Sequence, residues 1–121
     1  MERKYDLNER LINFAVTVID ISETLPKSFA GIHIAGQLVR SGTSPALNYG
    51  EAQSAESRND FIHKMKISAK ELRETFNCLR IIQKKNWHPA DTLATVLDEN
   101  NQLISIFVKS IETAKKNNTG K

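Results

Sequence analysis

Three short breaks divide the chain into four long segments in which apolar residues recur with helical spacing. The breaks lie around Pro26, at residues 54–57 and around Pro89. The segments between them run for about 20 to 28 residues, too long for strands and typical of helices. Only 5 glycines and 3 prolines occur among 121 residues, too few for the turns of many short strands. The sequence therefore predicts an all-α fold, an antiparallel up-down-up-down four-helix bundle in a single domain.

The same pattern gives approximate bounds for the helices. We expect helices over residues 6–25, 28–53, 58–85 and 89–116, followed by a polar tail that frays over 117–121. Ser28 and Ser57 precede the second and third helices and suit N-cap positions. Pro45 removes a backbone hydrogen bond inside the second helix, so we expect one helix kinked there, with two helices broken at Gly42 as the alternative. The small residues at 41–46 would let a neighbouring backbone approach closely.

The first segment is apolar around an unusually large part of its circumference. Its apolar side chains spread over roughly 220° of a helical wheel, about twice the usual stripe. Either this helix is central in the bundle, or another subunit covers its second side, and we favour the subunit. Two isoleucines on the outer side of the third helix add to this case. The residues expected at an interface between copies are Phe14, Val18, Ile21, Ile67 and Ile81.

Residue patterns that carry chemistry are few. Di-iron sites in bundles need Glu-x-x-His pairs, and no glutamate here has a histidine three residues later. Asp60 and His63 are expected to be a solvated pair. Cys78 is the one cysteine, so a single chain can form neither an internal disulfide nor a thiolate metal site, and we expect a small buried or interface residue there. We therefore predict a protein that is not an enzyme and that has no catalytic residues, cofactor or metal.

A set of polar residues follows one side of the second helix. Such a set can face solvent, satisfy backbone groups freed near Pro45, or bridge Arg40 to a neighbouring helix. A functional binding face is the remaining interpretation. We name these residues the polar ladder: His33, Gln37, Arg40, Ser44, Asn48 and Glu51.

The charge distribution of the third segment is the sharpest functional signal. Residues 58–85 include eight basic and three acidic residues, although the whole chain has a net charge of only +3. Five of the basic residues fall within an arc of roughly 80° and extend for about 27 Å along a helix. Phosphates are attracted to such a surface through counterion release, whereas a solvated face with long lysine stems is the plain alternative. We name these residues the basic stripe: Lys66, Lys70, Arg73, Arg80 and Lys84.

No aromatic residue falls within the arc of the basic stripe on the helical wheel, since Phe76 belongs to the apolar face of the same segment. Base stacking on it is therefore not expected, and contacts to the shape and backbone of a nucleic acid would dominate.

A set of short motifs at fixed spacing extends along the second and third helices. They are RSGTS at 40–44, Asn48, EAQ at 51–53, Ser57, DFIHK at 60–64, Lys70-Glu71, Glu74-Thr75 and Leu79-Arg80. These motifs resemble the four-helix bundle proteins of the 23S rRNA intervening-sequence family, also labelled S23 ribosomal protein-like, and the resemblance covers nearly the whole chain. It implies a ring-like homopentamer without established catalytic residues. The accessory protein of diversity-generating retroelements is similar to this family, and it binds nucleic acid and a reverse transcriptase through a basic surface.

The expected function is that of a homo-oligomeric bundle, a pentamer by the resemblance, that binds structured RNA or other nucleic acid through the basic stripe. The alternative is a scaffold in which the polar ladder or the outer face of the ring recruits a protein partner, with no direct nucleic-acid role. The sequence lacks a secretory signal and any apolar run of about 18 residues, so we expect no membrane span and a cytoplasmic location. Asn100 falls within the apolar face of the fourth helix, where we expect it to meet a polar group of another helix.

Overall fold

The computed structural model describes residues 6–119, with side chains as far as residue 117, and these residues form four helices and no strand. The helices are α1 (Leu7–Ser22), α2 (Phe29–Gln53), α3 (Arg58–Lys85) and α4 (Ala90–Thr119). The predicted all-α class and the four helices are confirmed. α2 is continuous through Gly42, which excludes two helices broken there, while the kink at Pro45 stays a prediction. None of the described helices is long and apolar enough to cross a membrane.

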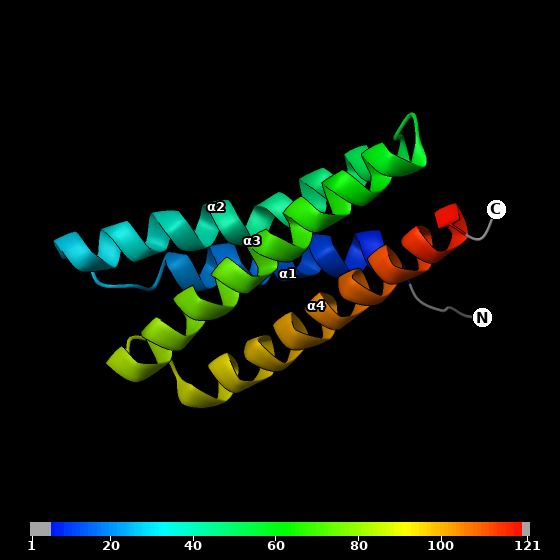
Figure 1. Ribbon diagram of the computed structural model, residues 1–121. Helices are drawn as coiled ribbons and strands as arrows, with labels where there is room; N and C mark the ends of the chain where they lie inside the picture. The colour runs from blue at the N-terminus through cyan, green and yellow to red at the C-terminus, as the bar shows by residue number, and fades with distance from the viewer. Residues whose placement is uncertain (1–5, 120–121) are drawn as a thin grey trace.

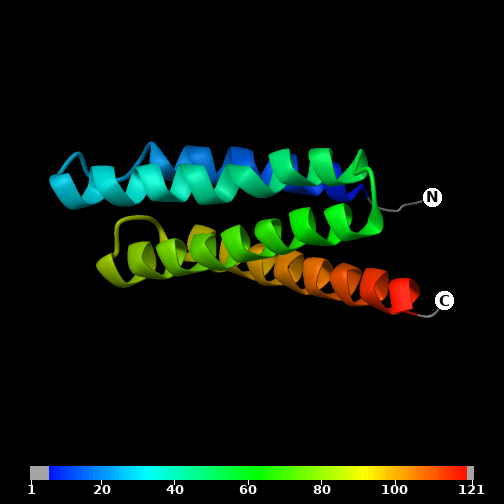
Figure 2. The ribbon, with the colours of Figure 1, turned by 45° about the horizontal axis from the view of Figure 1, so that its top comes forward.

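The four helices lie in two layers, with α1 and α2 in one layer and α3 and α4 in the other (Figure 2). The chain turns back at each connection, so α1 begins and α4 ends at the same end of the molecule (Figure 1). At the opposite end, the first turns of α2 extend beyond the end of α1 in both views. α2 therefore presents part of its N-terminal surface without cover from α1.

The starts of α2 and α3 are fixed by serine side chains, as predicted. Ser28 Oγ accepts a hydrogen bond from the Gly31 backbone N–H at 3.1 Å, and Ser57 Oγ accepts one from the Asp60 N–H at 3.0 Å. Each hydroxyl satisfies one of the N–H groups that a helix start leaves without an intrahelical partner. Gly31 also lies against the preceding connection, because a Cβ added to it would be 2.0 Å from the Pro26 carbonyl oxygen.

The end of the chain differs from the prediction. α4 continues to Thr119, so the end expected for this helix at residue 116 was wrong; the fraying expected over 117–121 stays a prediction, and residues 120 and 121 lie outside the described part. Once a helix has formed, each further residue adds one hydrogen bond at little cost. The polar residues after 116 include no proline, and the first glycine among them is Gly120.

The core is built from one buried face of each helix, and Asn100 is the one buried amide side chain among the residues whose side chains are described. Asn100 of α4 is fully buried, and its Nδ2 donates a hydrogen bond to the Leu72 carbonyl of α3 at 3.0 Å. The prediction that Asn100 meets a polar group of another helix is confirmed. This bond couples the two helices at one register, since a buried amide without a partner would be costly.

The predicted interface on α1 was wrong in its choice of side. Phe14, Val18 and Ile21 are buried in the core of the single chain, with at most 2% of their surface exposed. Ile12 and Val16 are instead exposed, at 39% and 52%. A wheel with two apolar sides does not by itself say which of them faces the core, and here α1 turns the side with heptad-like spacing inward.

The close approach predicted around Gly42 is confirmed. Gly42 is buried, and a Cβ built on it would be 2.5 Å from Val18 Cγ1. α1 and α2 thus approach each other at a distance that only glycine allows at this position.

Candidate nucleic-acid interface

The basic stripe lies along the solvent side of α3. Its residues are spaced by three, four or seven positions, which places them one above another on the same helix face. Four of the five side chains are exposed and Arg80 is half-buried, and the exposed Asn77 fills the gap between Arg73 and Arg80. The stripe is therefore a continuous polar surface that solvent, and a ligand, can reach.

The cations of the stripe have no ion-pair partner among the described residues. Two other cations of α2 and α3 are paired. Arg40 of α2 pairs with Glu71 and Glu74 of α3, and Lys64 of α3 pairs with Glu51 of α2 at 3.5 Å. All three acids of α3 thus lie against cations outside the stripe, since Asp60 also lies 3.8 Å from Lys64. The positive charge of the stripe remains uncompensated along its length.

A shallow hollow of about 240 Å³ borders the stripe on the side of α4. Lys66 and Arg73 line it from α3, and Glu112 and Lys115 line it from α4. The charges of Glu112 and Lys115 cancel, so the net charge of the residues that line the hollow is that of Lys66 and Arg73.

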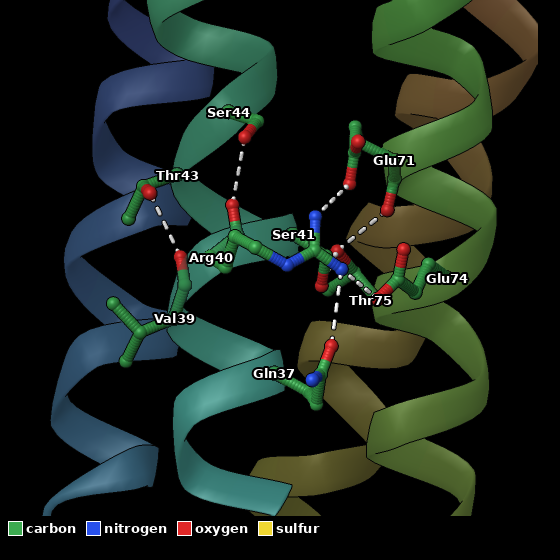
Figure 3. Close-up of polar contacts among 9 residues, drawn as sticks. All are labelled: Gln37, Val39, Arg40, Ser41, Thr43, Ser44, Glu71, Glu74 and Thr75. Atoms are coloured by element: carbon green, nitrogen blue, oxygen red, sulfur yellow. Dashed lines mark hydrogen bonds and ion pairs between the residues drawn. The ribbon is translucent and has the colours of Figure 1, made fainter.

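The centre of the polar ladder lies at the contact between α2 and α3, where Arg40 reaches the acids of α3 (Figure 3). Arg40 donates hydrogen bonds to Glu71 Oε1 at 3.0 Å and to Gln37 Oε1 at 3.1 Å, and it also pairs with Glu74. Glu51 pairs with Lys64 of α3. Of the interpretations offered by the sequence, the structure shows the bridge from Arg40 to a neighbouring helix, while His33 faces solvent.

The remaining members of the ladder have smaller roles. Ser44 Oγ donates to the Arg40 carbonyl at 2.8 Å, one turn earlier in α2. Asn48 is half-buried, and His33 is exposed at the protruding end of α2. The ladder therefore divides into a central part that joins two helices and an end that faces solvent.

Below the arginine bridge, a buried pair of hydroxyls joins the same two helices. The Thr75 and Ser41 oxygens lie 2.9 Å apart, and Thr75 Oγ1 lies 2.8 Å from the Glu71 carbonyl oxygen (Figure 3). Because Thr75 has one hydroxyl proton, it donates to the carbonyl and accepts from Ser41. The pair satisfies both buried groups and fixes the register of α2 on α3.

Cys78 is buried beside this bridge. Burial raises the pKa of its thiol, the Glu74 carboxylate raises it further, and Arg40 acts in the opposite direction. A thiol with a raised pKa is a poor nucleophile at neutral pH. The described residues also contain no group of three or more histidine, cysteine or acidic side chains that could hold a metal ion.

One feature near the stripe was missed by the sequence analysis. Phe29 and Trp87 line a common hollow together with Lys85, at the end of α3 where the stripe finishes. The two aromatic residues are 58 positions apart in the chain, one at the start of α2 and the other in the connection between α3 and α4, so no spacing rule could have joined them. The sequence offered only a weak signal of this hollow. Phe29 directly follows the predicted N-cap Ser28, at a position where helices often face solvent.

Comparison with known proteins agrees with the resemblance seen in the motifs. The family model for 23S rRNA-intervening sequence proteins matches residues 3–109. The fold is similar to the crystal structure of a protein of unknown function from the S23 ribosomal protein family of Bacteroides thetaiotaomicron, with a TM-score of 0.81 and 25% identity. That match covers 88% of this chain and 98% of the other. No curated protein matches the chain.

Proposed function

The chain belongs to the family of 23S rRNA-intervening sequence proteins, and from this premise we propose that it is a non-enzymatic, homo-oligomeric bundle that binds structured RNA through the basic stripe. The observation that carries the proposal is the uncompensated charge of the stripe. Five cations lie along about 27 Å of one helix, and none has an ion-pair partner among the described residues.

An RNA duplex suits such a surface for a physical reason. Its backbone offers phosphates at regular intervals, and each contact with a lysine or arginine releases condensed counterions. The major groove of an RNA duplex is too deep and narrow for side chains to reach the base edges. A protein therefore recognises the duplex mainly by its shape and its backbone. A straight row of cations, four of the five exposed, makes this kind of contact without reading sequence.

Self-association is the second part of the proposal, with the pentamer implied by the family resemblance as the expected state. Exposed apolar side chains support it: Val16 and Ile12 on α1, and Ile81 on α3 with 44% of its surface exposed. Ile67, the other outer residue expected at the interface, is half-buried. Several copies would present several stripes, which strengthens the binding of a long RNA without any new contact.

The test is fluorescence anisotropy of a labelled RNA hairpin, titrated with protein over a series of salt concentrations. The variant Lys66→Gln/Lys70→Gln/Lys84→Gln neutralises three exposed residues of the stripe. We expect its log K against log salt slope to fall by about three contacts, with weaker binding at low salt. Arg80 is left intact because its Nε is buried.

The matched control is Lys27→Gln/Arg58→Gln/Lys109→Gln, which removes the same charge from exposed positions outside the stripe. It should retain most of the affinity and slope. If both triple variants lose binding equally, net charge alone attracts the RNA and the stripe is not the interface. Binding that does not respond to salt would also contradict the proposal.

A scaffold that recruits a protein partner is the second candidate function, and one observation favours it. Leu47 of α2 is 70% exposed and has no evident role in the bundle. The centre of the polar ladder is a poor recruiting surface, because Arg40 and Glu51 are engaged with α3. Affinity capture from native cells after nuclease treatment separates the two functions, since only a scaffold would retain a stoichiometric protein.

A further inference from the structure

The end of the bundle where α2 protrudes carries an aromatic hollow. Its volume is about 670 Å³, within the range of about 300–1,000 Å³ typical of small-molecule pockets. Phe29 and His33 line it from α2, Ile81 and Lys85 from α3, and Trp87 from the connection to α4. We name these five residues the aromatic hollow.

Phe29 is the unusual member of this group. Its side chain is 91% exposed, more than any other large apolar residue among those described. The backbone beneath it is nevertheless held in place, because Ser28 caps the helix and Gly31 is in contact with Pro26. A rigid backbone that presents an uncovered ring loses little entropy on binding a flat partner, which suits a stacking platform.

The charge of the hollow favours an anionic partner. Lys85 is the only charged residue that lines it, and its Nζ lies 5.8 Å from the centroid of the Trp87 ring. The adjacent residue, Lys84, is the last member of the basic stripe. A ligand that follows the stripe to its end therefore meets aromatic rings and a further cation, without an acidic side chain lining the hollow.

We propose that the aromatic hollow binds an unpaired nucleobase of the RNA, with its ring stacked on Phe29, while the adjoining duplex lies on the basic stripe. This inference rests on the proposed function and deepens it by naming the class of RNA. Bases inside a duplex are already stacked on their neighbours, so only a single-stranded end or a splayed base can occupy the hollow. The preferred ligand is a duplex with unpaired nucleotides at its end.

The experiment compares two hairpins with the same stem, one blunt and one with a short single-stranded overhang, tested with the overhang at either end. Trp87 is the only tryptophan in the chain, so its fluorescence reports on the hollow directly. We expect an overhang to quench Trp87 emission and to raise affinity by about fivefold or more, since a stacked base contributes ~1–3 kcal/mol. The blunt hairpin should bind without this quenching.

Three variants isolate the ring of Phe29. Phe29→Leu keeps an apolar side chain and should lose the preference for the overhang, whereas Phe29→Tyr keeps a ring and should retain it. Leu47→Ala is the matched control, because it truncates another highly exposed apolar residue of α2. It should leave both affinities unchanged.

The outcomes separate this inference from the proposed function. If neither hairpin binds in a salt-dependent way, the proposed function fails and the inference fails with it. If the blunt hairpin binds but the overhang brings no gain that Phe29→Leu removes, the stripe stands and the hollow is not a base site. A lower assembled mass of Phe29→Leu in light scattering, with no change in RNA preference, would show that a second copy occupies the hollow and would overturn the inference.

Discussion

The contact between α1 and α2 predicts that the same substitution has opposite effects at two glycines of one helix. A Cβ built on Gly42 would be 2.5 Å from Val18 Cγ1 and 3.0 Å from Val18 Cβ. A Cβ built on Gly36, which is exposed, would have no heavy atom within 4 Å. The variants Gly42→Ala and Gly36→Ala therefore differ in packing and share the same change in chain entropy.

The magnitudes follow from these distances. Replacing an interior helical glycine by alanine gains about 0.5–1 kcal/mol when nothing obstructs the methyl group, so Gly36→Ala should stabilise the protein by that amount. Gly42→Ala receives the same gain, but forcing a methyl group into a filled core costs about 1–3 kcal/mol. Val18 is β-branched and cannot rotate out of the way within α1. The net result for Gly42→Ala is a loss of up to about 2.5 kcal/mol.

The assay is urea unfolding followed by far-UV circular dichroism, with the free energy of unfolding taken by linear extrapolation. A third variant, Val18→Ala, removes the atom closest to the new methyl group. In that background Gly42→Ala should be close to neutral, because the remaining Val18 Cβ distance of 3.0 Å needs only a small adjustment. The two positions should thus show a coupling of about 1 kcal/mol or more.

Equal stabilisation by the two alanines would refute this reasoning. It would mean that α1 and α2 separate at little cost, so that the close approach at Gly42 does not constrain the bundle. A large loss of stability in Gly36→Ala would also contradict the reasoning, because no atom lies close enough to the new methyl group to oppose the gain in chain entropy.

Two further predictions concern the assembly and the thiol. Val16→Glu, at a side chain 52% exposed, should leave the protein folded but lower its assembled mass in light scattering, whereas Val18→Glu should abolish cooperative unfolding because it places a carboxylate in the core. The raised pKa of Cys78 means less thiolate at a given pH, so iodoacetamide should alkylate the folded protein far more slowly than the urea-unfolded protein at pH 8. Equal rates of alkylation would show that the thiol is neither buried nor perturbed.

The local rules of helix formation made the fold readable from the sequence. Ser28 and Ser57 mark helix starts through their own hydroxyls, and the structure shows both bonds. Asn100 could be predicted as a bonded core residue, because a polar residue within an apolar face has few alternatives. The prediction of which side of α1 faces the core was wrong. That choice depends on how α1 sits against α2, and therefore on the contact at Gly42, which is not a property of α1 itself.

The candidate site divides in the same way. The basic stripe lies on one helix, so helical periodicity alone places its five residues on one face. The aromatic hollow combines residues of α2, α3 and a connection, so its existence depends on how the start of α2 lies relative to the end of α3. Sequence periodicity describes a single helix well, but it says nothing about the relative ends of helices that meet in space.

The arginine bridge explains why the stripe can remain positive. Glu71 and Glu74 lie on the flank of α3 that faces α2, within one turn of the stripe residues Lys70 and Arg73. Without a partner, their negative charges would offset part of the positive charge of the stripe. Arg40 offsets part of their field from the opposite side, and it does so with a side chain of α2. The polar ladder and the basic stripe are therefore linked: Arg40, at the centre of the ladder, pairs with the two acids of α3 that are next to stripe residues in the sequence.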